Sequence, residues 1–87
     1  MQRVWVKVLF WEVEEELRGG TWLTVPAGAT LADLFHVMVG RYPRFAAAVE
    51  GNPRLVLAMV DGVVRPDPRY KLAPDVRVVF YPALAGG

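Results

Sequence analysis

The stretch ATLADLFHVMVGRYP, residues 29–43, predicts the helix around which the rest of the chain is arranged. Its apolar side chains follow the three-to-four spacing of a helix with one buried stripe: Leu31, Leu34, Phe35 and Met38. Thr30 is suited to cap the first turn, and Asp33 favours the positive end of the helix dipole. Pro43 disfavours helical backbone at the preceding residue, so the helix is predicted to end near residues 40–41.

Strand-like segments lie on both sides of this helix. Before it, residues 4–11 alternate between two sets of apolar side chains, and TWLTV at 21–25 is a second strand-like run. After it, LVLAMV at 55–60 has the length and composition of a covered strand, and VRVVFY at 76–81 that of the last strand. Asp61-Gly62, followed by VVR, is the signal of a hairpin between the third strand and a short fourth one.

The connecting segments are short. EVEEEL at 12–17 predicts an exposed turn or a single helical turn, and RFAAAVE at 44–50 a second short helix. The order is therefore strand, strand, helix, strand, short strand, strand. The right-handed crossover rule then places the first and last strands in parallel at the centre of a mixed sheet.

This order is that of a β-grasp, ubiquitin-like fold of the α+β class, in which a mixed sheet of four to five strands holds one main helix. A chain of 87 residues has room for one core, so we expect a single domain over residues 1–87, with a flexible C-terminal tail at 82–87.

Few residues of the chain can carry chemistry. It has no Cys, no Ser and one histidine, His36, which lies off the apolar stripe and is predicted to be a solvated surface residue. The glutamates at 12–16 are interpreted as a solvated charged turn. No P-loop spacing is present, so ATP binding by the chain alone is not expected, and neither is a metal site. The chain is therefore not expected to be an enzyme by itself.

The balance of charge also excludes some partners. Ten Lys and Arg residues against nine Asp and Glu residues give a formal charge of +1, which argues against binding to nucleic acid through its phosphates. The N-terminal run contains Lys7 and lacks the features of a signal peptide, and no apolar stretch approaches the ~20 residues of a membrane span. We expect a cytoplasmic protein that does not bind membranes.

Alternation in the first and last strands predicts an apolar surface on the sheet. In the first strand, Val4, Val6, Val8 and Phe10 would face the helix, and Trp5, Leu9 and Trp11 the opposite side. In the last strand, Val79 and Tyr81 would share that opposite side. If the two strands are neighbours, four side chains form a contiguous patch that fits a partner protein: Trp5, Leu9, Val79 and Tyr81. The alternative is that a loop or the 44–50 segment covers this patch.

The chain resembles the MoaD/ThiS-type sulfur carriers, and most closely the small subunit of molybdopterin synthase. Four stretches carry the resemblance: VKVLFWEVEEELRGG (6–20), ATLADLFHVMVGRYP (29–43), LAMVDGVV (57–64) and LAPDVRVVFYPALAGG (72–87). The last stretch ends in Gly86 and Gly87, as in that family. It departs from the family pattern at Pro82-Ala83, where two adjacent prolines are usual.

The resemblance implies a carrier rather than a catalyst. In the family, a partner adenylating (E1-like) enzyme uses ATP to activate the terminal carboxylate, here that of Gly87, and sulfur from a persulfide then displaces AMP to give a thiocarboxylate. The tail then enters the large subunit of molybdopterin synthase and donates its sulfur in molybdenum cofactor biosynthesis. The tail residues that bind in the channel would be Gly86, Ala85, Leu84 and Pro82. Glycine has no Cβ atom and therefore fits a narrow channel.

Other functions stay open at this point. The same chemistry serves sulfur carriers for thiamine synthesis, tRNA thiolation or cysteine synthesis. It also serves ubiquitin-like modifiers, which end as an amide on a target lysine. A non-catalytic binding module, whose glycines are a frayed end, is the third alternative.

Overall fold

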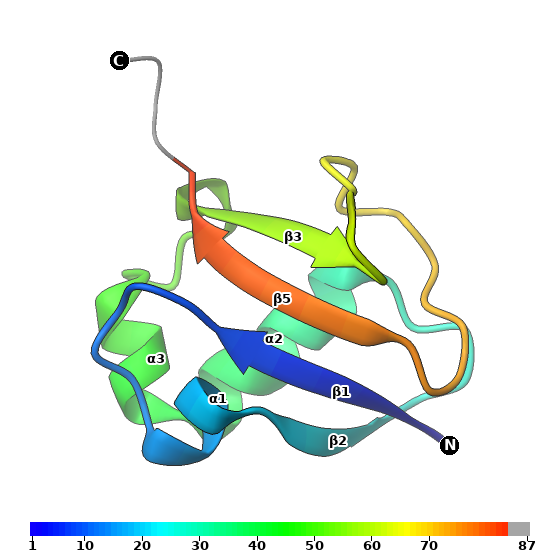
Figure 1. Ribbon diagram of the computed structural model, residues 1–87, viewed down its shortest axis with the longest axis horizontal. Coiled ribbons are helices and arrows are strands. Elements are labelled where there is room, and N and C mark those ends of the chain that lie inside the picture. The colour runs from blue at the N-terminus through cyan, green and yellow to red at the C-terminus, as the bar shows by residue number, and fades with distance from the viewer. Residues whose placement is uncertain (84–87) are drawn as a thin grey trace.

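The computed structural model describes residues 1–83 and has the predicted order of elements (Figure 1). The strands are β1 (Gln2–Val8), β2 (Thr21–Val25), β3 (Val56–Val60), β4 (Val63–Val64) and β5 (Arg77–Pro82). The helices are α1 (Glu15–Gly19), α2 (Leu31–Arg41) and α3 (Pro43–Ala48), with a 3₁₀ turn, η1 (Pro53–Leu55).

The five strands form one mixed sheet in the order β2-β1-β5-β3-β4. The two central strands, β1 and β5, are parallel, with Val6 opposite Val78 and Val8 opposite Phe80, and the other pairs are antiparallel. Figure 1 shows this sheet in front of α2. The predicted α+β, β-grasp fold is thus confirmed.

One core lies between the sheet and the helices. The inward residues of β1 and β5 pack against the buried stripe of α2, and α3 adds Phe45, which is fully buried. The Phe45 ring lies 5.7 Å from that of Phe35 on α2 and 6.3 Å from that of Phe80 on β5. The 44–50 segment therefore packs on the helix side of the sheet, and the alternative that it covers the opposite face is wrong.

The start of α2 is fixed by the predicted cap and by a distant loop. Thr30 Oγ1 accepts a hydrogen bond from the amide of Asp33 at 3.2 Å, and Asp33 Oδ2 accepts one from the amide of Thr30 at 2.9 Å. The amide of Leu31 donates to the carbonyl of Tyr70 and that of Ala32 to the carbonyl of Pro68, each at 3.0 Å. The first free amides of the helix are therefore satisfied within the chain.

The first strand is shorter than its alternation predicts. β1 ends at Val8, and Phe10 has a φ of 75°, in the left-handed region that side chains other than glycine rarely adopt. This turn reverses the alternation, so Phe10 is 85% exposed and Trp11 packs against the core. The prediction that Phe10 faces the helix and Trp11 the opposite side is wrong, because a period of two holds only while the backbone stays extended.

The acidic segment contains a structural residue. The carboxylate of Glu14 accepts hydrogen bonds from the amides of Arg44 at 2.7 Å and Phe45 at 3.0 Å, and so caps α3 from across the chain. Partial burial raises the pKa of Glu14, but these amides favour the ionised form and the net pKa is lowered. The interpretation of 12–16 as a merely solvated turn is therefore wrong for Glu14.

Replacing this carboxylate should make the stability of the fold less sensitive to acid. Because the folded-state pKa of Glu14 lies below the unfolded one, the stabilisation is complete above the unfolded pKa and is lost as the pH falls through the folded pKa. We expect Glu14→Gln to lower the free energy of unfolding by about 1 kcal/mol near pH 7, and the deficit to shrink near pH 3. Urea denaturation at both pH values measures this. Glu15→Gln, at an exposed neighbour, is the control, and a deficit that stays unchanged in acid would contradict the assignment.

Gly20 is required where α1 passes into β2. Its φ is 94°, and a Cβ atom built on it would overlap the indole ring of Trp5 on the neighbouring strand. Gly19, one residue earlier and inside α1, has nothing within 4 Å of such an atom. The structure therefore has room for a Cβ atom at position 19 but not at position 20.

Alanine variants of Gly19 and Gly20 provide a matched test of the contact between Gly20 and the Trp5 ring. Gly20→Ala should lower the free energy of unfolding by roughly 3 kcal/mol, because it combines a strained φ with a steric overlap. Gly19→Ala should raise it by about 0.5 kcal/mol through helix propensity. Thermal or urea unfolding of both variants measures the contrast, and equal effects would show that Trp5 does not pack against Gly20.

The last strand runs further than predicted. Pro82 is the final residue of β5 and pairs with Val56, and the amide of Ala83 donates to the carbonyl of Leu55 at 2.9 Å. The expectation that the tail starts at residue 82 is therefore wrong for Pro82 and Ala83. A proline at position 83 could not donate this bond, because proline has no backbone N–H.

Candidate functional site

The face of the sheet opposite α2, here called the outer face, is not covered by any element within residues 1–83 (Figure 1). The register arranges its side chains in rows across the strands. One row joins Trp22, Trp5 and Arg77, and the next joins Lys7, Val79, Met59 and Val64. Tyr81 lies opposite Leu57 in the row beyond, near the end of β5.

The tryptophan end of the outer face is held by arginines. The guanidinium of Arg77 lies 4.9 Å from the ring centre of Trp5, and that of Arg3 lies 4.2 Å from the ring of Trp22. Arg3 Nε also donates to Asp75 Oδ1 at 2.9 Å. Since its ring also packs against Gly20, Trp5 contributes to the structure as well as to the surface.

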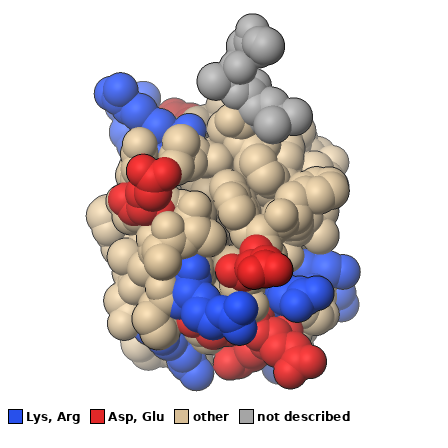
Figure 2. Space-filling model, turned by 90° about the vertical axis from the view of Figure 1, so that its left-hand side faces the viewer, with Lys and Arg blue, Asp and Glu red and all other residues tan. Residues whose placement is uncertain are grey.

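The other end of the outer face is a hollow next to the end of β5. It is lined by Phe10, Leu57, Tyr81 and Pro82 and has a volume of about 470 Å³. In Figure 2 the upper right of the view is uncharged, whereas charged groups lie at the upper left and across the lower half. A large exposed aromatic ring beside an apolar hollow is typical of a surface that contacts another protein.

The four predicted patch residues are all partly exposed and lie on the outer face or its continuation. Val79 and Tyr81 belong to β5, and Leu9 follows β1, with its amide donating to the carbonyl of Phe80 at 2.9 Å. Lys7 occupies the outward position between Trp5 and Leu9. The role of these four residues stays a prediction.

Sequence reasoning missed the contribution of β3 to this face. Leu57 and Met59 alternate with buried Ala58 and Val60, and they sit opposite Tyr81 and Val79. The interpretation of LVLAMV as a covered strand did not predict that Leu57 and Met59 would be partly exposed. The pairing of β3 with β5 shows that its odd-numbered residues enlarge the apolar surface toward the hollow.

The predicted reacting and channel-binding residues lie outside the described residues: Gly87, Gly86, Ala85 and Leu84. Pro82, the remaining one, is described and lines the hollow as the last residue of β5. β5 therefore leads from the outer face directly toward the segment that would react.

The described side chains offer little else for chemistry. His36 is exposed, as predicted. Within residues 1–83, no three His, Cys, Asp or Glu side chains come close enough together to hold a metal ion. In the same part of the chain, every helix is too short to span a bilayer.

Comparison with known proteins finds similarity in structure but not in sequence. Neither the known family models nor the curated proteins include a match. A crystal structure of SAMP1 from Haloferax volcanii is 20% identical, with a TM-score of 0.72, over 98% of this chain and 99% of that one. A crystal structure of small archaeal modifier protein 1 from H. volcanii is 18% identical, with a TM-score of 0.73, over 94% and 98%.

A third similar structure is that of the H. volcanii HVO 2177 protein, solved in solution. It is 18% identical, with a TM-score of 0.71, over 99% of this chain and 87% of that one. Similarity at these identities establishes the fold, and these neighbours define the class: this chain is a small ubiquitin-like β-grasp protein.

Replacement of Phe10 tests whether its exposed side chain contributes to the stability of the fold. Asn tolerates the left-handed backbone better than Phe, and the exposed ring buries little area. We expect Phe10→Asn to change the free energy of unfolding by less than about 0.5 kcal/mol, whereas Phe45→Ala in the core should lower it by about 4 kcal/mol. Urea unfolding compares them. A loss at Phe10 close to that at Phe45 would show that its ring is packed.

Proposed function

We propose that this chain is a sulfur carrier whose Gly87 carboxylate is adenylated by an E1-like partner, converted to a thiocarboxylate, and used to donate sulfur. The observation that carries the proposal is the similarity of fold to SAMP1 over 98% of this chain and 99% of that one. Together with the terminal Gly86-Gly87, it supports a protein whose reactive group is its own main-chain carboxylate.

The chemistry follows from the weakness of a carboxylate as an electrophile. A carboxylate oxygen of Gly87 attacks the α-phosphorus of ATP on the partner enzyme, and pyrophosphate leaves. The terminal sulfur of a persulfide then attacks the acyl carbon, and AMP leaves. A thiol cleaves the resulting S–S bond, so that the thiocarboxylate stays on Gly87 and a disulfide on the donor. ATP is used by the partner, and the carrier needs no bound cofactor.

The outer face supports the docking that this chemistry needs. Phe10 is exposed beside the hollow, and Tyr81 and Pro82 lie at the end of the strand that leads to the tail. A partner that contacts the hollow lies beside the end of β5, the strand that precedes the last residues of the chain. Glycines at 86 and 87 suit a narrow catalytic channel because they lack Cβ atoms.

Molybdopterin synthesis is the pathway we assign, with the large synthase subunit as sulfur acceptor, on the resemblance of the four stretches quoted above. We place the protein in the cytoplasm, where ATP is available to the partner enzyme. Sulfur carriers of thiamine, tRNA or cysteine pathways would use the same group. The acceptor that takes the sulfur distinguishes these pathways.

The test is the mass of the carrier after reaction. Incubation with the adenylating enzyme from the same source, ATP and a persulfide donor should raise the intact mass by the difference between one sulfur and one oxygen atom. Deletion of Gly87 should abolish this change. Phe10→Asn should slow it while leaving the melting temperature unchanged. Absence of any mass change with every such enzyme of that source would refute the carrier function.

A second candidate function is protein modification, favoured by the similarity to small archaeal modifier protein 1. A modifier would use the same adenylated carboxylate, but a lysine amine would displace AMP to leave an amide bond. Purification of the tagged chain from its source cells, followed by tryptic peptide analysis, distinguishes the two. Lysines carrying a remnant of this tail indicate modification, and thiocarboxylate without such lysines indicates sulfur transfer alone.

A further inference from the structure

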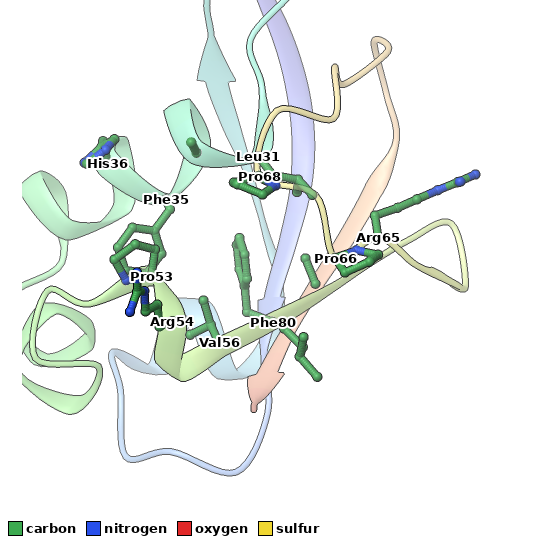
Figure 3. Close-up of a pocket in the computed structure, with 13 residues that line it drawn as sticks. Leu31, Phe35, His36, Pro53, Arg54, Val56, Arg65, Pro66, Pro68 and Phe80 are labelled. Carbon is green, nitrogen blue, oxygen red and sulfur yellow. The ribbon is translucent and has the colours of Figure 1, made fainter. Parts of the chain in front are cut away.

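A second cavity lies on the helix side of the sheet, between the start of α2 and strand β3 (Figure 3). Its volume is about 560 Å³, within the range of sites that bind small ligands or single side chains of a partner. Phe35, Val56 and Phe80 contribute apolar surface to it from α2, β3 and β5. The outer face and its hollow lie on the other side of the sheet.

The rim of this cavity is stiff. Pro53 stands at one end, next to Val56, and Pro66 and Pro68 belong to the loop that leads back to α2. Proline fixes its own φ, and the carbonyl of Pro68 is also held by the amide of Ala32 at 3.0 Å. A preformed rim lowers the entropy lost on binding.

Two arginines border the cavity. Arg54 is exposed at one end, beside the exposed His36, and Arg65 lines the other end. No carboxylate is among the lining residues, and the nearest in sequence are Asp33 on α2 and Asp67 between Pro66 and Pro68. The guanidinium of Arg65 lies 4.7 Å from the ring centre of Tyr70 and points away from the cavity in Figure 3, whereas Arg54 is exposed beside the cavity.

The start of α2 does not itself offer an anion site. The amides of Leu31, Ala32 and Asp33 already donate to Tyr70, Pro68 and Thr30. Attraction of a negative group to this cavity therefore comes from the side chains at its rim. The guanidinium of Arg54 can pair with a carboxylate, and the apolar walls beside it favour an occupant that also carries an aliphatic group.

The edge of the sheet beside the cavity leaves room for a chain. β4 pairs only with Met59 and Val60, so on the side of β3 away from β5 no strand among the described residues lies beside the start of β3. The amide of Val56 is already bonded to the carbonyl of Pro53. A segment passing here would therefore bind mainly through inserted side chains rather than by extending the sheet.

We propose that this cavity binds an extended, acidic segment of a partner protein, with an aliphatic side chain inserted against Phe35 and Phe80 and a carboxylate next to Arg54. The charge at the rim and the apolar interior select this occupant. The proposal does not rest on the sulfur-carrier function, because it uses neither the tail nor the outer face.

The test uses the full-length chain, labelled with ¹⁵N, and two synthetic peptides. Acetyl-Glu-Glu-Leu-Leu-Glu-Glu-amide should shift the amide signals of residues 31–36 and 56–58 in a saturable way. The same peptide with lysines in place of the glutamates should not. Absence of saturable shifts, shifts confined to the outer face, or equal binding of both peptides would overturn the proposal.

Variants then separate the contributions of charge and cavity. Arg54→Glu should weaken binding of the acidic peptide about tenfold, whereas Arg18→Glu, which makes the same change of net charge on α1, should not. Ala32→Phe places a ring in the cavity and should abolish binding, whereas Ala47→Phe on the exposed side of α3 should not. If Ala32→Phe fails to fold, the arginine pair decides, and equal affinity in both arginine variants would overturn the proposal.

Discussion

The parallel pairing of β1 with β5 is the constraint on which the remaining structure depends. It joins residues near the two ends of the chain, with Trp5 opposite Arg77 and Val8 opposite Phe80. Parallel strands cannot be joined by a tight turn, so the chain between them must cross one face of the sheet. Here α2 makes that crossing and α3 packs beside it, so all the apolar cover lies on one side.

The open outer face is a direct consequence of this arrangement. Its central strands carry Trp5, Val79 and Tyr81 outward because their neighbours in sequence are needed in the core. The apolar side chains that remain on this side are stabilised in different ways. At one end arginines stack on tryptophans, and at the other Phe10 and Tyr81 border a hollow beside the end of β5. Only the second end lies beside the end of β5.

Strand β3 contributes residues to both the hollow and the cavity. The outward side of Leu57 belongs to the hollow, and the strand it sits on also borders the cavity under α2. The two surfaces differ in chemistry, since the hollow is lined by apolar and aromatic residues, while the cavity has arginine and histidine at its rim. The two surfaces therefore differ both in chemistry and in the side of the sheet on which they lie.

The sequence by itself determined the local elements. The apolar spacing and the Thr30 cap located α2, Asp61-Gly62 located the hairpin, and the crossover rule predicted the parallel centre. The predicted patch on β1 and β5 followed from alternation, whereas the proposed role of Gly87 came first from the resemblance.

Tertiary structure decided the features that depend on distant contacts. The left-handed turn at Phe10 exposes a ring that alternation assigns to the core. The carboxylate of Glu14 caps a helix about thirty residues away along the chain. The pairing of β3 with β5 places Leu57 beside the hollow and brings together the strand residues that line the cavity beneath α2. The spacing of apolar residues predicts which side chains share a face only while the backbone keeps one regular conformation. It cannot predict where the backbone turns, or which residues distant in sequence then come into contact.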